Sequence, residues 1–348
     1  VWLCETTGKS ILKLTDEDYN KNGLSDLLAL EGSSYDLNIN MFNHFQNTIT
    51  GWPGGKPGAD DSTRPERKSP NSKRVIIFSP HPDDDVVSMG GTFDRLVSQG
   101  HEVHIAYQVK GNIAVSDHDA LKFIEVSKDM FKNNSKVPVG QLIKELVNNK
   151  PDKIDSQAVR DLKGFIRKRE AIAATRYIGI PDSNTHFMNL PFYDTGRIKK
   201  NPPTTKDVLI TASLIKKIKP HQIFAAGDLE DPHGTHKVCL DVILDALDTL
   251  KGEKFIKDCW LWLYRGAWLD WDVHDIDMAV PMSPAQVLRK RKAIFFHQTQ
   301  KDGVMFQGQD LREFWVRAEE RNSETAEKYK KMGLADYAAI ESFKRHYY

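Results

Sequence analysis

One histidine and three consecutive carboxylates follow a short apolar run in this chain, in the stretch Ser79-Pro80-His81-Pro82-Asp83-Asp84-Asp85. The apolar run, residues 75–78, is typical of a buried strand, and residues 86–99 are typical of a helix closed by Gly100. Adjacent carboxylates repel one another, and burial disfavours their charged forms. A divalent cation removes both penalties because it is the largest local charge in such a site. The stretch therefore predicts a metal site at the end of a strand.

A second polar cluster, residues 227–236, has the same setting, because it follows the apolar segment 222–226 and precedes the helical segment 235–250. It contains the pair His233 and His236. In a parallel sheet such strand-to-helix turns share the carboxyl edge, where open α/β folds place their sites. We therefore expect the two clusters to meet in space, although about 150 residues separate them.

Together the two clusters supply the ligand set of a catalytic zinc site. His81, Asp84 and His236 give two imidazoles and one carboxylate, which leaves a coordination position open for water. Asp83 then remains beside the metal as the general base toward that water. His233 is the candidate acid or electrostatic partner for the developing oxyanion.

Each motif also has a simpler interpretation. A run of aspartates is commonly a solvated loop or a helix cap, and capping of the following helix is the role we expect for Asp85. A His-x-x-His pair near a helix start often only hydrogen-bonds to the backbone. The shared sheet edge is what favours the metal site.

Composition limits the classes of partner and compartment. The 348 residues carry 49 basic and 48 acidic side chains, a net charge of +1, so there is no basic footprint for nucleic acid. The three cysteines are too few for a disulfide framework and fit a reducing compartment, which predicts a cytoplasmic protein. No apolar run reaches the roughly 20 residues that span a bilayer, so no membrane partner is expected. A homo-oligomer is compatible with the sequence.

Strand-like and helix-like segments alternate along most of the chain, which predicts an α/β fold with a Rossmann-like, mostly parallel sheet flanked by helices. A helical N-terminal segment, 1–50, and a Gly/Pro-rich linker or long surface loop, 51–73, precede the catalytic domain, 74–348. The end of the chain is expected to be helical. The expected strands are 75–78, 102–108, 185–190, 222–226, 259–264 and 276–280, and the expected helices are 86–99, 117–149, 155–178, 205–218, 235–250, 284–296 and 309–343.

At these residues the chain resembles the LmbE/PIG-L family of zinc-dependent N-deacetylases. The family's first motif is a hydrophobic strand followed by (Pro/Ala)-His-Pro-Asp-Asp-(Glu/Asp), and its later motif is His-x-x-His, here 233–236. The resemblance implies the same ligands and the same roles for Asp83 and His233, and it covers roughly residues 74–300. Family members often carry Asp before the last motif histidine, where this chain has Thr235, so Asp231 or Asp228 is expected to support the site instead.

Two further segments resemble the family less tightly. Residues 167–171 look like the family's Arg-x-x-Glu helix, in which Arg169 either faces the substrate or belongs to an ion-paired surface. Residues 292–300 resemble the late Lys…His-x-Ser-Gln segment, in which His297 either lines the cleft or caps a helix. Both residues are candidate substrate-binding groups. The opening residues 1–10 look like the end of a sugar-phosphate isomerase-type domain, and some bacterial proteins similar to glucosamine-6-phosphate deaminase carry a LmbE-type domain behind it.

The expected function is hydrolysis of an N-acetyl group from an amino sugar or related N-acyl amine, with Zn²⁺ or another divalent metal as cofactor. The expected partner is a small N-acetylated amino sugar or sugar phosphate. A metal-dependent phosphoesterase is the second hypothesis, because Asp-rich turns also suit two-metal phosphate chemistry. The third is a non-catalytic sugar-sensing domain attached to a deaminase-like protein. A structural zinc normally has four protein ligands, and the three candidates found here favour catalysis.

Overall fold

A computed structural model describes residues 1–348 except 131–138, 150–153, 198, 232–233, 267 and 302–309. Its centre is a seven-stranded sheet in the order β3-β2-β1-β4-β5-β7-β6. The first five strands in this order run parallel, whereas β7 is antiparallel to both β5 and β6. The strands are β1 Arg74–Ser79, β2 Glu102–Tyr107, β3 Thr185–Phe187, β4 Gln222–Ala226, β5 Trp260–Tyr264, β6 Met278–Met282 and β7 Ala339–His346.

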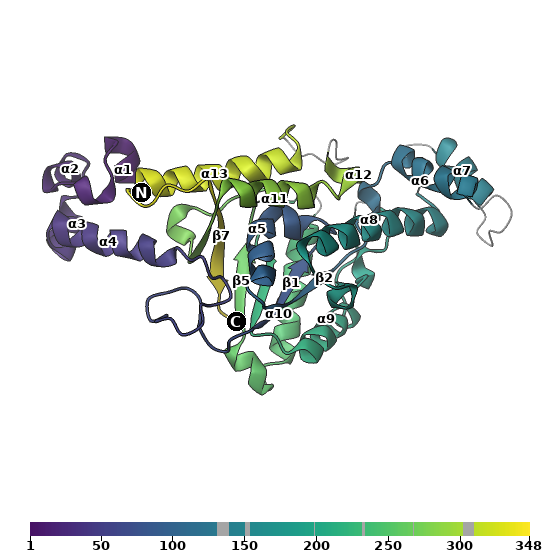
Figure 1. Ribbon diagram of the computed structural model, residues 1–348, viewed down its shortest axis with the longest axis horizontal. Helices are drawn as coiled ribbons and strands as arrows, with labels where there is room; N and C mark the ends of the chain where they lie inside the picture. The colour runs from purple at the N-terminus through teal and green to yellow at the C-terminus, as the bar shows by residue number, and fades with distance from the viewer. Residues whose placement is uncertain (131–138, 150–153, 198, 232–233, 267, 302–309) are drawn as a thin grey trace.

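Helices cover both faces of this sheet, and the two ends of the molecule are helical as well (Figure 1). The N-terminal helices lie at one end of the long axis, and α6 and α7 lie at the other (Figure 1). In the described part of the chain, no helix is long and apolar enough to cross a bilayer. The helices are α1 Trp2–Thr7, α2 Asp16–Lys21, α3 Ser25–Glu31, α4 Ser34–Thr48, α5 Asp84–Ser98, α6 Asp117–Met130, α7 Val139–Val147, α8 Gln157–Ile178, α9 Thr205–Ile218, α10 Thr235–Thr249, α11 Pro284–Ile294, α12 Gln298–Lys301 and α13 Phe314–Lys331.

The core has two parts because successive strand residues point to opposite faces of the sheet. Val75 and Ile77 of β1 pack with α5, α8 and α11 on one face. Ile76 and Phe78 pack with α9 and α10 on the other. All four side chains are fully buried, as expected of a parallel strand covered on both faces. The strand ends therefore hold the following turns in fixed positions.

The α/β class and the mostly parallel sheet predicted from the sequence are confirmed. The predicted helix over 309–343 is wrong at its end, because α13 stops at Lys331 and residues 339–346 form β7. This strand lies inside the sheet, and its residues 339–343 are all buried, including Glu341 and Ser342. Two buried polar residues interrupt the apolar alternation that would have indicated a strand.

The first 73 residues pack against the rest of the protein. Leu3, Tyr19 and Phe45 belong to the same apolar cluster as the sheet residues beside α9 and α10. The segment 51–73 is a loop anchored by hydrogen bonds, including Gln222 Nε2 to the Pro53 carbonyl at 3.1 Å. It takes the form of the surface loop that was one of its two predicted forms. The division of the chain into domains stays a prediction.

Candidate active site

The three predicted ligands lie together where the neighbouring strands β1 and β4 end. Nδ1 of His81 lies 3.2 Å from Oδ2 of Asp84, and Nε2 of His236 lies 3.3 Å from the same oxygen. One ligand atom from each residue can be chosen so that all three lie within 4.8 Å of one another. Ligand atoms about 2.1 Å from a tetrahedral zinc ion are separated by about 3.4 Å. The spacing and the chemistry of this donor set therefore fit a zinc ion.

The tight turn after β1 brings two of the ligands together. The carboxylate of Asp84 accepts a hydrogen bond from the backbone N–H of His81 at 2.8 Å. The backbone N–H of Asp83 donates to the His81 carbonyl, also at 2.8 Å. Because α5 begins at Asp84, the third residue after His81 is turned back toward the imidazole. The spacing His-x-x-Asp thus forms one side of the site without any distant contact.

The third ligand is oriented from its own side by two aspartates. The carboxylate of Asp231 accepts the backbone N–H groups of Thr235 and His236, at 2.8 and 3.1 Å, and so caps α10. Nδ1 of His236 donates to the backbone carbonyl of Asp228 at 2.7 Å. That bond fixes the ring so that Nε2 faces Asp84, the usual arrangement of a metal-binding histidine. Asp228 and Asp231 give this support in place of the residue at position 235.

The charges of this group are strongly coupled. Burial raises the pKa of Asp84, but the charge of His236 and hydrogen bonds from His236 and His81 outweigh burial and hold it well below its usual range. Burial lowers the pKa of His236, but the charge of Asp84 and the hydrogen bond to it prevail and raise that pKa to about 10. The proton on Nε2 of His236 therefore points toward Asp84, where a metal ion would bind. Ion binding must release that proton.

Asp83, the predicted base, is held by a buried arginine. Nη2 of Arg167 lies 2.9 Å from Oδ1 of Asp83, and the Arg167 side chain is only 1% exposed. Nε and Nη1 of the same guanidinium are buried and have no hydrogen-bond partner among the described residues. The guanidinium beside the predicted base therefore keeps unused hydrogen-bond donors.

Arg169, for which a substrate-facing and a surface position were both left open, is exposed on α8, and its role in substrate binding stays a prediction, whereas Arg167 contacts Asp83. Two positions along a helix correspond to about 200° of rotation, so the two side chains point in nearly opposite directions. The sequence carried a signal for the arginine that contacts Asp83. In the pattern Arg-x-x-Glu, the arginine that lies three residues before Glu170 is Arg167.

The late segment 297–300 packs against the same helix. The carboxylate of Glu170 accepts two hydrogen bonds from Thr299, one from its backbone N–H and one from its hydroxyl, each at 2.8 Å. His297 is 1% exposed, and neither ring nitrogen has a partner among the described residues. Burial lowers the pKa of His297 well below its usual value, and the charge of Arg167 adds to this effect. His297 is therefore a neutral imidazole with one free donor and one free acceptor.

His233 and Asp85 belong to the two sequence motifs but not to the group of three candidate ligands. His233 lies outside the described residues, so its place in the site stays a prediction. Asp85 does not cap the helix as expected, because its carboxylate accepts hydrogen bonds from the hydroxyls of Ser79 and Tyr107, at 3.2 and 3.0 Å. Full burial raises the pKa of Asp85 to about 7. This residue ties α5 to the ends of β1 and β2.

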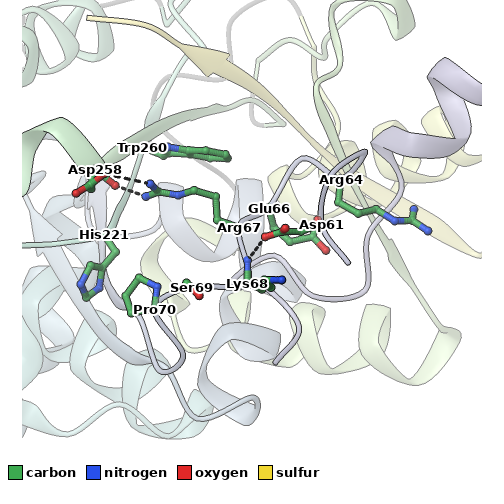
Figure 2. Close-up of a pocket in the computed structure, with 10 residues that line it drawn as sticks. All are labelled: Asp61, Arg64, Glu66, Arg67, Lys68, Ser69, Pro70, His221, Asp258 and Trp260. Carbon is green, nitrogen blue, oxygen red and sulfur yellow. Dashed lines mark hydrogen bonds and ion pairs between the residues drawn. The ribbon is translucent and has the colours of Figure 1, made fainter. Parts of the chain in front are cut away.

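A separate pocket lies at the opposite, amino-terminal edge of the sheet, beside the starts of β4 and β5 (Figure 2). Its volume is about 680 Å³. The guanidinium of Arg67 lies 4.4 Å from the ring centroid of Trp260 and pairs with Asp258, and the backbone of Lys68 bonds to Asp61 (Figure 2). Glu66 accepts a hydrogen bond from Thr50, which is not part of the lining, and none of the lining residues belongs to the metal group.

Comparison with known proteins identifies the family of the domain that contains these residues. A family model described as "PIG-L: GlcNAc-PI de-N-acetylase" matches residues 76–247. A relative from Bacteroides thetaiotaomicron, a "putative glucosamine-6-phosphate deaminase-like protein", is 53% identical over 352 residues. That alignment covers 99% of this chain and 53% of the relative, so the chain spans about half the length of this curated protein.

Similar solved structures include N,N'-diacetylchitobiose deacetylase from Pyrococcus horikoshii, with 18% identity and a TM-score of 0.48, over 79% of this chain and 84% of that one. GalB, the 4-carboxy-2-hydroxymuconate hydratase from Pseudomonas putida, has 14% identity and a TM-score of 0.48, over 79% and 97%. Residues 76–247 include His81, Asp83, Asp84, Arg167 and His236. The chain therefore carries a domain of the PIG-L family, which contains the three candidate metal ligands, Asp83 and Arg167, whereas His297 follows the matched residues.

Proposed function

We propose that this protein is a metal-dependent deacetylase that hydrolyses the N-acetyl group of an amino sugar or a related N-acyl amine. One observation carries the proposal: the buried His81–Asp84–His236 group lies beside Asp83, within a domain of a de-N-acetylase family. Zinc fits the donor set, with His81, Asp84 and His236 as its ligands. The bound ion would lower the pKa of a water molecule and polarise the amide carbonyl.

The protein's own residues then carry the proton and the substrate. Asp83 accepts the proton of the attacking water, while its ion pair with Arg167 keeps the carboxylate oriented. A carbon–oxygen bond forms, the amide carbon–nitrogen bond breaks, and the transferred proton leaves with the amine. His233 is the proposed partner of the oxyanion. The free nitrogens of His297 and of Arg167 are proposed to bind sugar hydroxyls or the acyl oxygen.

The substrate class also rests on what relatives do. The diacetylchitobiose enzyme acts on an N-acetylated sugar, and the family description names an N-acetylglucosaminyl lipid. The name of the Bacteroides relative refers to a sugar phosphate. We therefore place N-acetylated amino sugars and their phosphates first among the substrates to be tested.

The phosphoesterase hypothesis finds less support. Two-metal phosphate chemistry needs a second ligand set within about 4 Å of the first ion. Among the described residues the other candidate group is Asp272, His274 and Asp275, which lies near the surface and shares no residue with the first. Nothing in the described site therefore favours it.

Metal analysis combined with an amine-release screen on N-acetylated sugars and sugar phosphates tests the proposal. The wild-type protein should hold about one divalent ion and release acetate and amine. D83N should keep the ion and lose about 10²- to 10⁴-fold in kcat, as for loss of a general base. D84A should lose the ion. An unchanged metal content in D84A would show the ligand assignment to be wrong, and phosphoester hydrolysis without amide hydrolysis would favour the phosphoesterase.

A further inference from the structure

Helix α5, which carries the ligand Asp84, is broken one turn after it begins. Met89 has φ −135° and ψ 27°, which are not helical values, and the helix resumes at the pair Gly90-Gly91. The first part, residues 84–88, follows the predicted base Asp83 directly. Both parts pack in the same apolar cluster as the sheet, the first through Val86 and Val87 and the second, residues 90–98, through Phe93 and Leu96. Helix α5 lies against the sheet (Figure 1). The contacts of Asp85 hold the catalytic turn on the side of the strand ends, and the break lies on its other side.

A residue from the last strand caps the second part of α5. The backbone N–H of Gly91 donates to Oε1 of Glu341 at 2.9 Å, and that of Thr92 donates to Oε2 at 2.6 Å. These are the donors that the side-chain oxygen of an N-cap residue normally accepts. Met89 stands at the N-cap position and has no such oxygen. Glu341, 250 residues further along the chain, supplies both acceptors from β7.

A buried lysine completes this contact. Nζ of Lys290 on α11 lies 2.8 Å from Oε1 of Glu341 and donates to Oδ1 of Asn322 on α13, also at 2.8 Å. The side chains of Lys290 and Glu341 are each 1% exposed. We call Glu341, Lys290 and Asn322 the clasp. Three elements that contribute no metal ligand thereby hold the break in α5.

The backbone at the break approaches the clasp too closely for side chains. A Cβ atom on Gly90 would lie 3.0 Å from Cγ of Lys290. A Cβ atom on Gly91 would lie 2.2 Å from Sδ of Met282 and 3.3 Å from Oε1 of Glu341. The clasp can therefore pack against α5 at this point only because residues 90 and 91 have no side chains.

We propose that Glu341 is a positioning residue for the metal site, because the clasp fixes the break from which the turn bearing Asp83 and Asp84 is oriented. The inference rests on the function proposed above for that turn. A buried ion pair contributes little net stability compared with apolar residues of the same shape. Its value here lies in orientation: without the carboxylate, the N–H groups of Gly91 and Thr92 lose their acceptors, and the catalytic turn keeps only its anchor through Asp85.

Three variants test the clasp. E341Q removes the charge and keeps the shape, and the double variant E341Q/K290M removes both charges, so that no unpaired ion is left buried. D207N is the matched control, because Asp207 is a fully buried carboxylate that caps α9 through three hydrogen bonds, to Phe192 N and to the N–H and hydroxyl of Thr204. All three lose a buried helix cap, but only the clasp variants act on α5.

Two measurements are made on each variant, well below its unfolding temperature. The first is zinc affinity by competition with a chelator. Loss of groups that orient metal ligands typically costs about 10- to 100-fold in affinity, and we expect that loss in E341Q and in the double variant but not in D207N. The second is hydrogen exchange of the amides of Val87 and Ser88 in the ion-free protein, which should be faster in the clasp variants alone.

The outcomes separate the clasp from the proposed function. Wild-type zinc affinity and exchange in both clasp variants would overturn the role of Glu341, whatever the enzyme does. An equal loss of affinity in D207N would also overturn it, because the effect would then follow general stability. If the wild-type protein binds no zinc, the proposed function fails, while faster exchange at Val87 and Ser88 still supports the clasp.

Discussion

Replacing Arg167 by methionine should separate the base Asp83 from its buried partner. The ion pair spans 2.9 Å, and the side chains of Arg167 and Asp83 are 1% and 12% exposed. Removing one member of a buried pair typically costs about 3–5 kcal/mol, because the other charge is left without compensation. We expect R167M to lose free energy of unfolding in this range, measured by urea denaturation of the ion-free protein.

Activity should fall as well, because Asp83 then lacks the contact that orients it. A misplaced base is expected to lower kcat/KM about 100-fold, which corresponds to about 2.7 kcal/mol of transition-state stabilisation. R169M is the matched control, since Arg169 is exposed two residues further along the same helix. It should keep its kcat/KM within about twofold.

A third variant distinguishes orientation from stability alone. R167K keeps the charge but not the planar fork, so it should restore part of the stability and less of the activity. All rates are measured on the amine-release substrate at a temperature where every variant is folded. The reasoning is refuted if R167M and R169M have the same activity, or if R169M is the more damaged of the two.

Two other perturbations follow from the structure. G111A should lower both the free energy of unfolding and kcat/KM. Gly111 has φ +64°, and a Cβ atom there would lie 2.9 Å from Cδ of Pro82 and 3.2 Å from Nε of Arg167. Normal turnover in G111A would show that this close contact does not matter for the site. The free energy of unfolding should also decrease as the pH is lowered, because of His101. Burial and the charge of Lys73 lower the pKa of His101 to about 4. The unfolded chain takes up this proton below its usual pKa of about 6.5 and the folded chain does not, so about 2 kcal/mol should be lost between pH 7 and pH 5. Urea denaturation of ion-free wild type and H101N at both pH values checks this, and equal pH slopes would rule it out.

The sequence predicted the metal group because its geometry follows from topology. His81 and Asp84 share one tight turn, and His236 follows the neighbouring parallel strand, so only the sheet order had to be correct. The contact between Arg167 and Asp83 could not be predicted in the same way. It depends on the rotation of α8, which packing against the sheet decides.

Other features depend on contacts that no local pattern records. Asp85 follows the helix start like a cap, but buried hydroxyls of Ser79 and Tyr107 attract its carboxylate. The buried strand β7 contains a charged residue, Glu341, which such a strand normally avoids. Its carboxylate is accommodated because it pairs with Lys290 and accepts the backbone N–H of Gly91 in α5. Both misreadings come from polar groups whose partners lie far away in the sequence.

The position of β7 has a consequence for the order in which the protein is made. Residues 339–346 lie between β5 and β6, although both of those strands are synthesised earlier. Until β7 emerges from the ribosome, the edges of β5 and β6 lack their partner and α5 lacks its cap. Unpaired strand edges of this kind are prone to wrong association. A chain interrupted shortly before residue 339 would therefore contain His81, Asp83, Asp84 and His236 but lack the strand that carries Glu341.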